Sequence, residues 1–414
     1  MRVLMISDHA DPTSLTARTP TPLTTGSHAA GGQNVYVRIL ATELARAGVR
    51  VDIFTRRSSA DAARTDTIAP GVTVVRLDAG PPGRLPRDSF LDVLPEFTDA
   101  LCEHVNGQAF TYDLIQSNYW FSGIAGLRLR DLLGVPQVHM NCSFGHLRRA
   151  SYGEWRNEFY AIREDAERRI ARSVAATVVS SAWEGRLVRE RFGADPDSIH
   201  EIPIGADRGF RPADRLGARR RLGIDERGPV VLFVGRPELR KGLMTLGVAW
   251  QTLRDRHPGM TLVMVGPDEA SLAEDPKLRP LSDLLLEDPA PILAGPVPHT
   301  DLIDYYNAAD VTVVPSHYEP YGIVAVEAMA CGVPVVASRV GGLQDIVADG
   351  VTGLSVDPGN STDLANAVSE IVAGKLGPVP LKAAVTRYRS HFSWARATPR
   401  YLQLYSDLVK SGVE

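Results

Sequence analysis

VTVVPSHYEPYGIVAVEAMACGVPVVAS, residues 311–338, combines two β-branched runs with a stretch of small residues between them. The runs at 311–316 and 334–338 have the composition of buried strands. The segment AVEAMACG between them is typical of a helix made of small residues. A strand, a helix and a second strand in this order predict a unit with two parallel strands and a crossover helix.

The same alternation of strand and helix extends along the chain and restarts once. Strand-like runs occur first at residues 2–7, 49–55, 72–77, 113–117, 136–140 and 176–181, and then at 229–235, 260–266, 291–295, 311–316, 334–338 and 352–356. A chain of 414 residues is also too long for one ordinary core. We therefore predict an α/β protein with two Rossmann-like domains, each a doubly wound parallel sheet covered by helices.

The break between the two series of strands places the domain boundary. Residues 1–205 form the predicted N-terminal domain and 206–392 the C-terminal one, with a linker from Ile202 through an Arg-rich stretch to about Gly228. Residues 393–414 have the apolar spacing of a helix and are expected to pack back on the N-terminal domain. Ligands of such sheets bind outside the carboxyl ends of the strands, so we expect a site in a cleft between the domains.

One connection is longer than a usual loop of this fold. Residues 8–30 are rich in Thr, Pro, Ala and Ser. A loop of that length is typical of a lid or a binding element, and a disordered insertion is the other interpretation. The sequence leaves both open.

The composition narrows the functional classes. A formal net charge of −4 disfavours a nucleic-acid or anionic-membrane surface, and no apolar run approaches the ~18 residues of a membrane span. The three cysteines form no CxxC pair, which indicates a reducing compartment without a disulfide framework or a zinc site. With no leader at the N-terminus, we expect a cytoplasmic protein. The absence of a GxGxxG fingerprint and of a P-loop disfavours a nicotinamide oxidoreductase.

The stretch that decides the fold also carries polar residues suited to a nucleotide sugar. Gly322 opens the helix, where unpaired amides and the helix dipole can bind a diphosphate. Glu327 can accept hydrogen bonds from both ribose hydroxyls, and Glu319 in the loop can accept them from the hydroxyls of a sugar. Two glutamates eight residues apart are common on protein surfaces, but the strand, the EPYG turn and the helix around them make this pattern specific.

Two further loops complete the predicted site. In VGRPELRKGL (234–243), Arg236 and Lys241 follow the first strand of the second domain. Fixed cations there can stabilise the negative charge of a departing nucleoside diphosphate without a metal. In the first domain, Gly31 and Gly32 before a predicted helix allow a phosphate or a sugar to approach the backbone closely.

These motifs, GGQNVYV, GRPELRKG and the E-x7-E stretch EPYGIVAVE, together with the terminal FSW helix, resemble the retaining family-4 glycosyltransferases of the GT-B fold. The resemblance covers essentially the whole chain. It is strongest to the branch that begins mycothiol synthesis by adding N-acetylglucosamine to inositol phosphate, and more distant to sucrose-phosphate synthase. It implies metal-independent transfer from a nucleotide-diphosphate sugar, with UDP favoured over GDP, to a small acceptor in small-molecule biosynthesis.

The resemblance also assigns the donor residues. It implies that Arg236 and Lys241 bind the diphosphate, Glu327 the ribose and Glu319 the transferred sugar, with Glu319, Arg236 and Lys241 as the catalytic residues. The full donor set that it implies is Gly31, Gly32, Arg236, Lys241, Val297, Glu319, Gly322, Ile323, Val324 and Glu327. Such enzymes react on one face of the sugar, with the leaving phosphate helping to deprotonate the acceptor, so no protein nucleophile is needed.

The acceptor half departs from the family pattern. Cys142 and Asn118 stand where relatives often carry histidine, so Cys142 is either a small buried residue or the mark of a reshaped sugar pocket. The acceptor positions that the resemblance implies are Asn34, Arg87, Tyr119, Cys142, Ser143 and Arg163. Arg87 and Arg163 predict an anionic acceptor with a phosphate or a carboxylate. A solvated loop position is the other interpretation of Arg87.

Other functions remain open from the sequence. A sugar-nucleotide epimerase or hydrolase shares the fold, and a non-catalytic sugar-nucleotide binding protein would keep the same pocket. A metal-dependent transferase of another fold would use Asp195 and Asp197 as metal ligands, but they lie between a helix and a strand, where a turn is expected. The nucleotide base, the sugar, the acceptor and the oligomeric state, a homodimer included, are not fixed by the sequence.

Overall fold

The computed structural model describes residues 1–15, 32–83, 85–86, 89–152, 158–285, 289–375 and 379–411. These residues form two compact units. The first contains Met1–Ser14, Gly32–Ile202 and the chain from Ala397 onward, and the second contains Pro203–Arg396. Each unit is built around one largely parallel sheet, which confirms the predicted α/β class.

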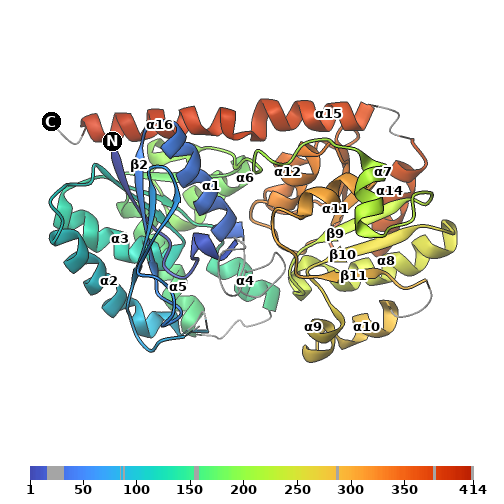
Figure 1. Cartoon of the computed structure of the whole chain (residues 1–414), viewed down its shortest axis with the longest axis horizontal. Coiled ribbons are helices and arrows are strands. Elements are labelled where there is room, and N and C mark those ends of the chain that lie inside the picture. Colours follow the sequence, from blue (N-terminus) through green and yellow to red (C-terminus); the bar gives the residue numbers. More distant parts are fainter. Residues whose placement is uncertain are drawn as a thin grey trace. The chain divides into compact units, whose positions relative to one another are not determined.

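The first unit contains an eight-stranded sheet in the order β3-β4-β2-β1-β5-β6-β7-β8 (Figure 1, blue to green). Its strands are β1 Arg2–Ile6, β2 Arg50–Arg56, β3 Thr65–Ala69, β4 Val72–Leu77, β5 Leu114–Asn118, β6 Gln137–Met140, β7 Ala176–Val179 and β8 Ile199–Glu201. Its helices are α1 Gly32–Arg46, α2 Phe90–Asn106, α3 Trp120–Leu133, α4 Gly145–Tyr152, α5 Glu158–Ser173 and α6 Ala182–Leu187. Short 3-10 and π turns cover Pro12–Leu15, Val188–Phe192 and Pro196–Ser198.

β1 shows why the first sheet needs helices on both faces. Leu4 and Ile6 point to the face covered by α2, α3 and α5, where they join a core with Phe97. Val3 and Met5 are just as buried. Because neighbouring side chains of a strand point to opposite faces, an apolar run of this kind is buried only when both faces are covered. In Figure 1, α2 and α3 lie on one side of this sheet and α1 on the other.

β3 was not predicted from the sequence. It pairs antiparallel with β4 at the edge of the first sheet, and its first three residues are exposed. An edge strand needs no apolar alternation, because one side of it faces water. Its position is fixed by the strand pairing and by an ion pair of 2.7 Å between Arg76 Nη1 and Asp66 Oδ2. The first sheet therefore differs from the predicted parallel sheet at this one edge.

The second unit contains a six-stranded parallel sheet in the order β11-β10-β9-β12-β13-β14 (Figure 1, yellow to orange). Its strands are β9 Val230–Val234, β10 Thr261–Val265, β11 Ile292–Gly295, β12 Val311–Val314, β13 Val335–Ser338 and β14 Gly353–Val356. Its helices are α7 Arg215–Leu222, α8 Leu243–Arg256, α9 Glu269–Glu274, α10 Arg279–Leu285, α11 Leu302–Ala308, α12 Ile323–Ala330, α13 Leu343–Ile346, α14 Ser361–Val372 and α15 Val379–Arg387. Short 3-10 and π turns cover Leu239–Lys241 and Tyr388–Phe392. Trp250 of α8 and Leu364 of α14 are fully buried in a core with strands β9, β10 and β12.

The Arg-rich stretch in which the interdomain linker was predicted contains a helix of the second unit, α7. α7 is anchored by Arg219, whose Nε donates to Ala308 O at 2.9 Å and whose Nη2 lies 2.5 Å from Asp310 Oδ2. Arg221 on the same helix pairs with Asp304 at 2.6 Å. The arginines therefore fix α7 within the second unit, because a buried guanidinium needs its acceptors close by.

α16, Trp394–Ser411, is the last helix of the described chain. From Ala397 on it belongs to the first unit, where the hydroxyls of Tyr401 and Tyr36 are 2.8 Å apart. Tyr405 OH donates to Gln116 Oε1 of β5 at 2.7 Å. Both contacts are buried. No helix among the described residues is long and apolar enough to cross a membrane.

The strand order reverses at one point in each sheet. In the first sheet, β1 lies between β2 and β5, and in the second, β9 lies between β10 and β12. The loops that follow the two strands at such a point diverge to opposite sides of the sheet and leave room for a ligand. The loops after β1, β5, β9 and β12 are therefore the places where the fold favours functional side chains.

Candidate functional site

Lys241 and Glu319 form an ion pair at the switch point of the second sheet. Lys241 follows β9, Glu319 follows β12, and Lys241 Nζ donates to Glu319 Oε2 at 2.5 Å. Their side chains are only 14% and 12% exposed. Burial would raise the pKa of the Glu319 carboxyl, but the charges of Lys241 and Arg240 outweigh it and hold this pKa below its ordinary value. Burial lowers the pKa of the Lys241 ammonium, which the Glu319 charge opposes.

Arg236 and Arg240 are held by a glutamate between them. Glu238 Oε1 lies 2.9 Å from Arg236 Nη1, and its Oε2 lies 2.6 Å from Arg240 Nε. The carbonyl of Arg240 accepts a hydrogen bond of 2.8 Å from the amide of His317, which connects the loop after β9 to the loop after β12. Glu238 was not among the predicted site residues. Its function as an anchor for both arginines became visible only with the fold.

The N-terminus of α12 lies where the sequence predicted a helix to start. Gly322 has a φ of 103°, which favours glycine, and a Cβ there would lie 2.5 Å from Leu343 Cδ2. Its carbonyl accepts the first helical hydrogen bond, from Ala325 N at 2.9 Å. The amides of Ile323 and Val324 precede that bond, so they point out of the end of the helix. They offer main-chain donors to an anion, supported by the helix dipole.

Two further glycines support the loop that carries Glu319. Gly342 N lies 3.3 Å from Glu319 O and 3.2 Å from Pro320 O, within hydrogen-bonding distance of both. A Cβ on Gly341 would lie 1.9 Å from Glu319 O. The loop after β13 is therefore packed backbone to backbone against the loop after β12, and neither glycine was among the predicted site residues.

We expect Gly341→Ala to lower the free energy of unfolding by about 1–3 kcal/mol and to weaken binding of a nucleoside diphosphate, because the new Cβ displaces the Glu319 loop. Urea denaturation and calorimetric titration measure the two effects. Gly350→Ala is the matched control, because Gly350 also has a positive φ, 71°, but no heavy atom lies within 4 Å of its Cβ position. Equal loss of nucleotide binding in both variants would show that the packing of Gly341 against the Glu319 loop does not support the site.

Glu327 is buried and held by two partners. Its Oε1 lies 2.8 Å from His299 Nε2, and its Oε2 accepts a hydrogen bond of 2.8 Å from Tyr306 OH. Phe210 lies against both rings, with centroids 5.1 Å from His299 and 5.6 Å from Tyr306. Burial and the charge of Glu327 raise the pKa of Tyr306, so its hydroxyl remains a donor. Val297 lies two residues before His299 and is also buried.

Three of the six predicted acceptor residues, Tyr119, Cys142 and Ser143, follow β5 and β6. Tyr119 and Cys142 are the only described residues other than glycine with a positive φ, 78° and 58°. Such conformations cost about 1–3 kcal/mol in residues with large side chains, and they cluster at functional sites. Tyr119 N donates to Met140 O at 2.8 Å, which holds the ends of the two neighbouring strands together.

Arg163 of α5 connects several of these residues. It is fully buried, and its Nε donates to Glu167 Oε1 at 2.7 Å. Its Nη2 donates to Ser143 O at 2.7 Å and Ser143 Oγ at 2.9 Å, and its Nη1 donates to Tyr119 OH at 3.2 Å. Gly145 N donates to the same Glu167 carboxylate at 3.0 Å. Arg163 thus fixes the loop after β6, and its contact with an acceptor anion remains a prediction. Glu167 was not predicted.

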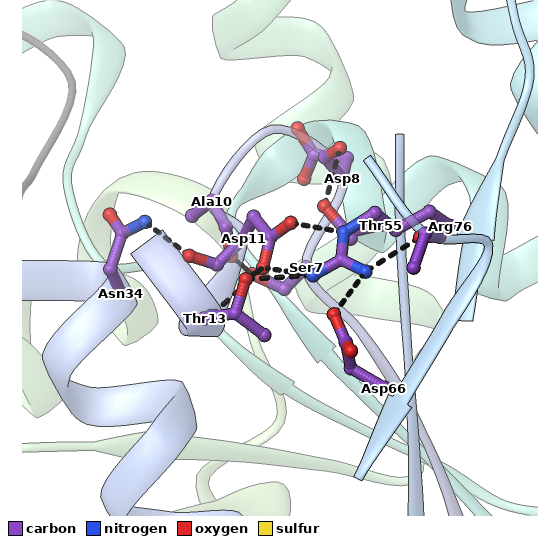
Figure 2. A network of polar contacts seen from close by, with 10 residues as sticks. Ser7, Asp8, Ala10, Asp11, Thr13, Asn34, Thr55, Asp66 and Arg76 are labelled. Atoms are coloured by element: carbon purple, nitrogen blue, oxygen red, sulfur yellow. Dashed lines mark hydrogen bonds and ion pairs between the residues drawn. The ribbon is translucent and has the colours of Figure 1, made fainter. Parts of the chain in front are cut away.

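Asn34, in the first turn of α1, contacts the loop after β1. Its Nδ2 donates to Asp11 O at 3.1 Å, and the Asp11 carboxylate pairs with Arg76 Nε at 2.6 Å. Arg76, only 4% exposed, also bonds to Asp66 and Thr13 (Figure 2). One buried guanidinium therefore anchors the loop after β1 to the edge of the sheet.

The two departures from the family pattern have different surroundings. Asn118 is fully buried, and its Nδ2 donates to Ile6 O at 3.1 Å. Cys142 is half-buried, and burial together with the charges of Glu184 and Asp8 raises the pKa of its thiol. The thiol therefore stays protonated near neutral pH, so Cys142 is not a thiolate nucleophile.

Gly32 is the first residue of α1. Gly31 and Arg87 lie outside the described residues, so their functions remain predictions. In the described part of the chain, no group of three or more His, Cys, Asp or Glu side chains is arranged to hold a metal ion. Asp197 N donates to Asp195 Oδ1 at 3.0 Å at the start of a 3-10 turn, which confirms the turn predicted there.

Two protein families match the chain in succession. The family described as "Glycosyl transferase 4-like domain" matches residues 31–205, and the one described as "Glycosyl transferases group 1" matches residues 214–388. The D-inositol 3-phosphate glycosyltransferase of Acidothermus cellulolyticus is 38% identical over 99% of this chain and 90% of its own length. The protein of the same name from Corynebacterium jeikeium is 34% identical over 100% of this chain and 98% of its own.

A solved structure is similar over the same length. Sucrose-phosphate synthase from Thermosynechococcus elongatus is 34% identical and superposes with a TM-score of 0.88, covering 99% of this chain and 100% of that one. Its fold is the GT-B fold, so the predicted fold class is confirmed.

Proposed function

The chain belongs to the glycosyltransferase family that includes the D-inositol 3-phosphate glycosyltransferases, and on that premise we propose that it transfers a sugar, with retention of configuration, from a nucleoside-diphosphate sugar to a small anionic acceptor. The names of the relatives favour D-inositol 3-phosphate as the acceptor, and the family resemblance favours N-acetylglucosamine as the sugar and UDP over GDP as its carrier. We further propose that the reaction needs no metal.

The observation that carries this proposal is the buried ion pair of Lys241 and Glu319 beside the N-terminus of α12. Lys241 has three N–H donors, so it can keep Glu319 and still donate to a phosphate oxygen. With Arg236 and the amides of Ile323 and Val324, it supports a diphosphate site that is positive before the bond to the sugar breaks. Such preorganised charge stabilises the leaving group without reorganisation of solvent.

Glu319 and Glu327 suit the neutral, hydroxyl-bearing parts of the donor. The low pKa of Glu319 keeps it ionised, so it accepts hydrogen bonds from the hydroxyls of the transferred sugar. Glu327 uses one acceptor position on each oxygen for His299 and Tyr306, and a carboxylate has about four such positions. The remaining positions suit a ribose. No protein nucleophile is required in this scheme, because the acceptor hydroxyl attacks on the face of the sugar from which the phosphate leaves, and the leaving phosphate accepts its proton.

The acceptor side of the proposal rests on Tyr119, Ser143 and Arg163, which are joined by hydrogen bonds in the first unit. A guanidinium, a hydroxyl and a phenol together form the kind of donor set that binds a phosphate or a carboxylate. The backbone of Tyr119 itself and that of Cys142, next to Ser143, have a positive φ, and such strained positions are typical of functional sites.

The test is a product assay with the full chain. UDP-N-acetylglucosamine, UDP-glucose and GDP-glucose are each incubated with D-inositol 3-phosphate, with unphosphorylated inositol or with no acceptor, and the anomeric configuration of the product is read by NMR. We expect transfer from a UDP-sugar to the phosphorylated acceptor, an α-linked product, and an unchanged rate in EDTA. Turnover without an acceptor would indicate an epimerase or a hydrolase. Nucleotide binding without any turnover would indicate a sugar-nucleotide binding protein.

A further inference from the structure

Three buried side chains connect α16 to the ends of β5 and β1. Tyr405 OH donates to Gln116 Oε1 at 2.7 Å, and Gln116 Nε2 donates to Asn118 Oδ1 at 3.2 Å. Asn118 Nδ2 in turn donates to the carbonyl of Ile6, the last residue of β1, at 3.1 Å. Tyr405, Gln116 and Asn118 are fully buried. A continuous chain of hydrogen bonds therefore runs from the terminal helix to the switch point of the first sheet.

Each hydrogen bond of this chain has a fixed direction. A main-chain carbonyl can only accept, so the amide nitrogen of Asn118 must face Ile6 and its oxygen must face Gln116. The nitrogen of Gln116 then faces Asn118, and its oxygen faces Tyr405. Burial raises the pKa of Tyr405 well above its ordinary value, so its hydroxyl stays protonated and donates. The hydroxyl of Tyr405 therefore helps to fix the orientation of both amides.

Asn118 lies between the two loops of the switch point. Its side chain reaches the end of β1, and its carbonyl accepts a hydrogen bond of 3.3 Å from Gln33 Nε2 in the first turn of α1. The next residue, Tyr119, has a φ of 78°. A residue keeps such a conformation only where its surroundings fix the backbone. The contacts of Asn118 supply part of that fixation.

Two predicted acceptor residues are direct neighbours of the residues joined in this way. Tyr119 follows Asn118, and Asn34 follows Gln33. A shift of Asn118 therefore displaces both of them, whereas the proposed diphosphate site belongs to the second unit. Damage to the chain of hydrogen bonds should weaken acceptor binding and leave nucleotide binding unchanged.

From this geometry we propose that Tyr405 is a positioning residue for the acceptor: through Gln116 and Asn118, its hydroxyl holds Tyr119 and the start of α1 in the arrangement that binds the acceptor. The inference rests on the proposed function and deepens it, because it adds a residue of the terminal helix to the acceptor half. Tyr405 is fully buried, so it acts through these side chains and does not touch the acceptor.

Tyr401, one turn before Tyr405 on α16, is the matched control. It is also buried, and its hydroxyl lies 2.8 Å from that of Tyr36. The ring centroids of Tyr401 and Tyr405 are 5.8 Å apart. Tyr401→Phe and Tyr405→Phe each remove one buried hydroxyl from the same helix, so their losses of stability should be similar. Only Tyr405→Phe removes the hydroxyl that donates to Gln116.

The experiment measures initial rates of the full chain with UDP-N-acetylglucosamine as donor and D-inositol 3-phosphate as acceptor. We expect Tyr405→Phe to raise the acceptor KM by about 3- to 10-fold and to keep the Kd for UDP within about twofold of wild type. Tyr401→Phe should lower the midpoint of urea denaturation by a similar amount, but it should keep the acceptor KM within about twofold of wild type.

Gln116→Met breaks the next link and tests whether the three residues act as a unit. It should raise the acceptor KM at least as much as Tyr405→Phe does. Adding Tyr405→Phe to Gln116→Met should change this KM by less than about twofold, because residues that act through one another are not additive. An increase in the double variant equal to the product of the two single increases would refute the chain.

Hydrogen exchange of residues 114–122, which contain β5 and the start of α3, tests the chain without a substrate. We expect mass spectrometry to show faster exchange there in Tyr405→Phe than in Tyr401→Phe. If wild type transfers sugar and both tyrosine variants have the same acceptor KM, Tyr405 does not position the acceptor. If wild type transfers no sugar, the proposed function fails. Faster exchange in Tyr405→Phe alone would then still support the positioning of Tyr119, and equal exchange would overturn it.

Discussion

Replacement of Lys241 by methionine is expected to lower kcat/KM for the nucleotide sugar by about 100- to 1,000-fold. In the proposed site, the variant loses a fixed cation beside the leaving diphosphate and also leaves the Glu319 carboxylate, 12% exposed, without the lysine. The first effect reduces kcat and nucleotide affinity. The second raises the pKa of Glu319, because burial then acts without the opposing charge of Lys241. Initial rates over a range of donor concentrations and calorimetric titration with UDP measure the loss.

Lys375→Met is the control for removing a lysine from a Lys–Glu pair. Lys375 Nζ lies 3.9 Å from Glu370 Oε1 on the surface, where the lysine is 67% exposed. Such pairs contribute little, so activity and stability should stay near wild type. The stranded Glu319 carboxylate should also make Lys241→Met less stable than wild type, and adding Glu319→Gln should restore that stability without restoring turnover. Full activity in Lys241→Met would refute the assignment of the diphosphate site.

Arg163→Met should lower the free energy of unfolding by about 3–5 kcal/mol, the largest effect on stability that we expect from one substitution. Arg163 and Glu167 are 0% and 1% exposed, so the variant leaves a buried carboxylate without its counter-ion. It also removes the hydrogen bonds that hold Ser143 and Tyr119. Urea denaturation measures the first loss, and the acceptor KM reports the second.

Arg168→Met is the matched control on the same helix, because Arg168 pairs with Asp165 at 3.6 Å and both side chains are exposed. It should change the free energy of unfolding by less than about 0.5 kcal/mol. Arg163→Met combined with Glu167→Leu should recover about half of the lost stability or more, since an apolar pair carries no stranded charge. If the double variant recovers stability but not the acceptor KM, Arg163 contributes to acceptor binding beyond its support of the loop. Recovery of both the stability and the acceptor KM would show that Arg163 only supports the loop.

Most strands could be predicted because their residues are apolar and β-branched. The runs around β1, β9 and β12 are buried on both faces, and short β-branched runs of this kind are typical of strands in a parallel sheet. β3 could not be predicted, since TDTIA lies at an edge and only the pairing with β4 makes it a strand. The helix within the Arg-rich stretch was not predicted, for a related reason. From the sequence alone, Arg219 has the character of a solvated surface residue. Its partners Ala308 and Asp310 lie far along the chain and bury it only in the folded protein.

The residues of the candidate site were likewise predicted only in part. Glu319, Gly322 and Lys241 were predicted because motif and local element coincide. The two residues that hold Glu327 were not predicted, because both lie far from it in sequence. His299 and Tyr306 reach Glu327 from 28 and 21 residues away. Sequence spacing carries no sign of such contacts, since they depend on the order of strands in the sheet.

Because α16 contacts Tyr36 and Gln116, the first unit can complete its folding only at the end of translation. Residues 397–411 are synthesised after the whole second unit, although they complete the first. Until they emerge, the nascent first unit lacks the buried contacts that Tyr401 and Tyr405 make with Tyr36 and Gln116. Chaperones that hold nascent chains should therefore stay on this unit long after its own strands have been translated, and release it only once the second has formed.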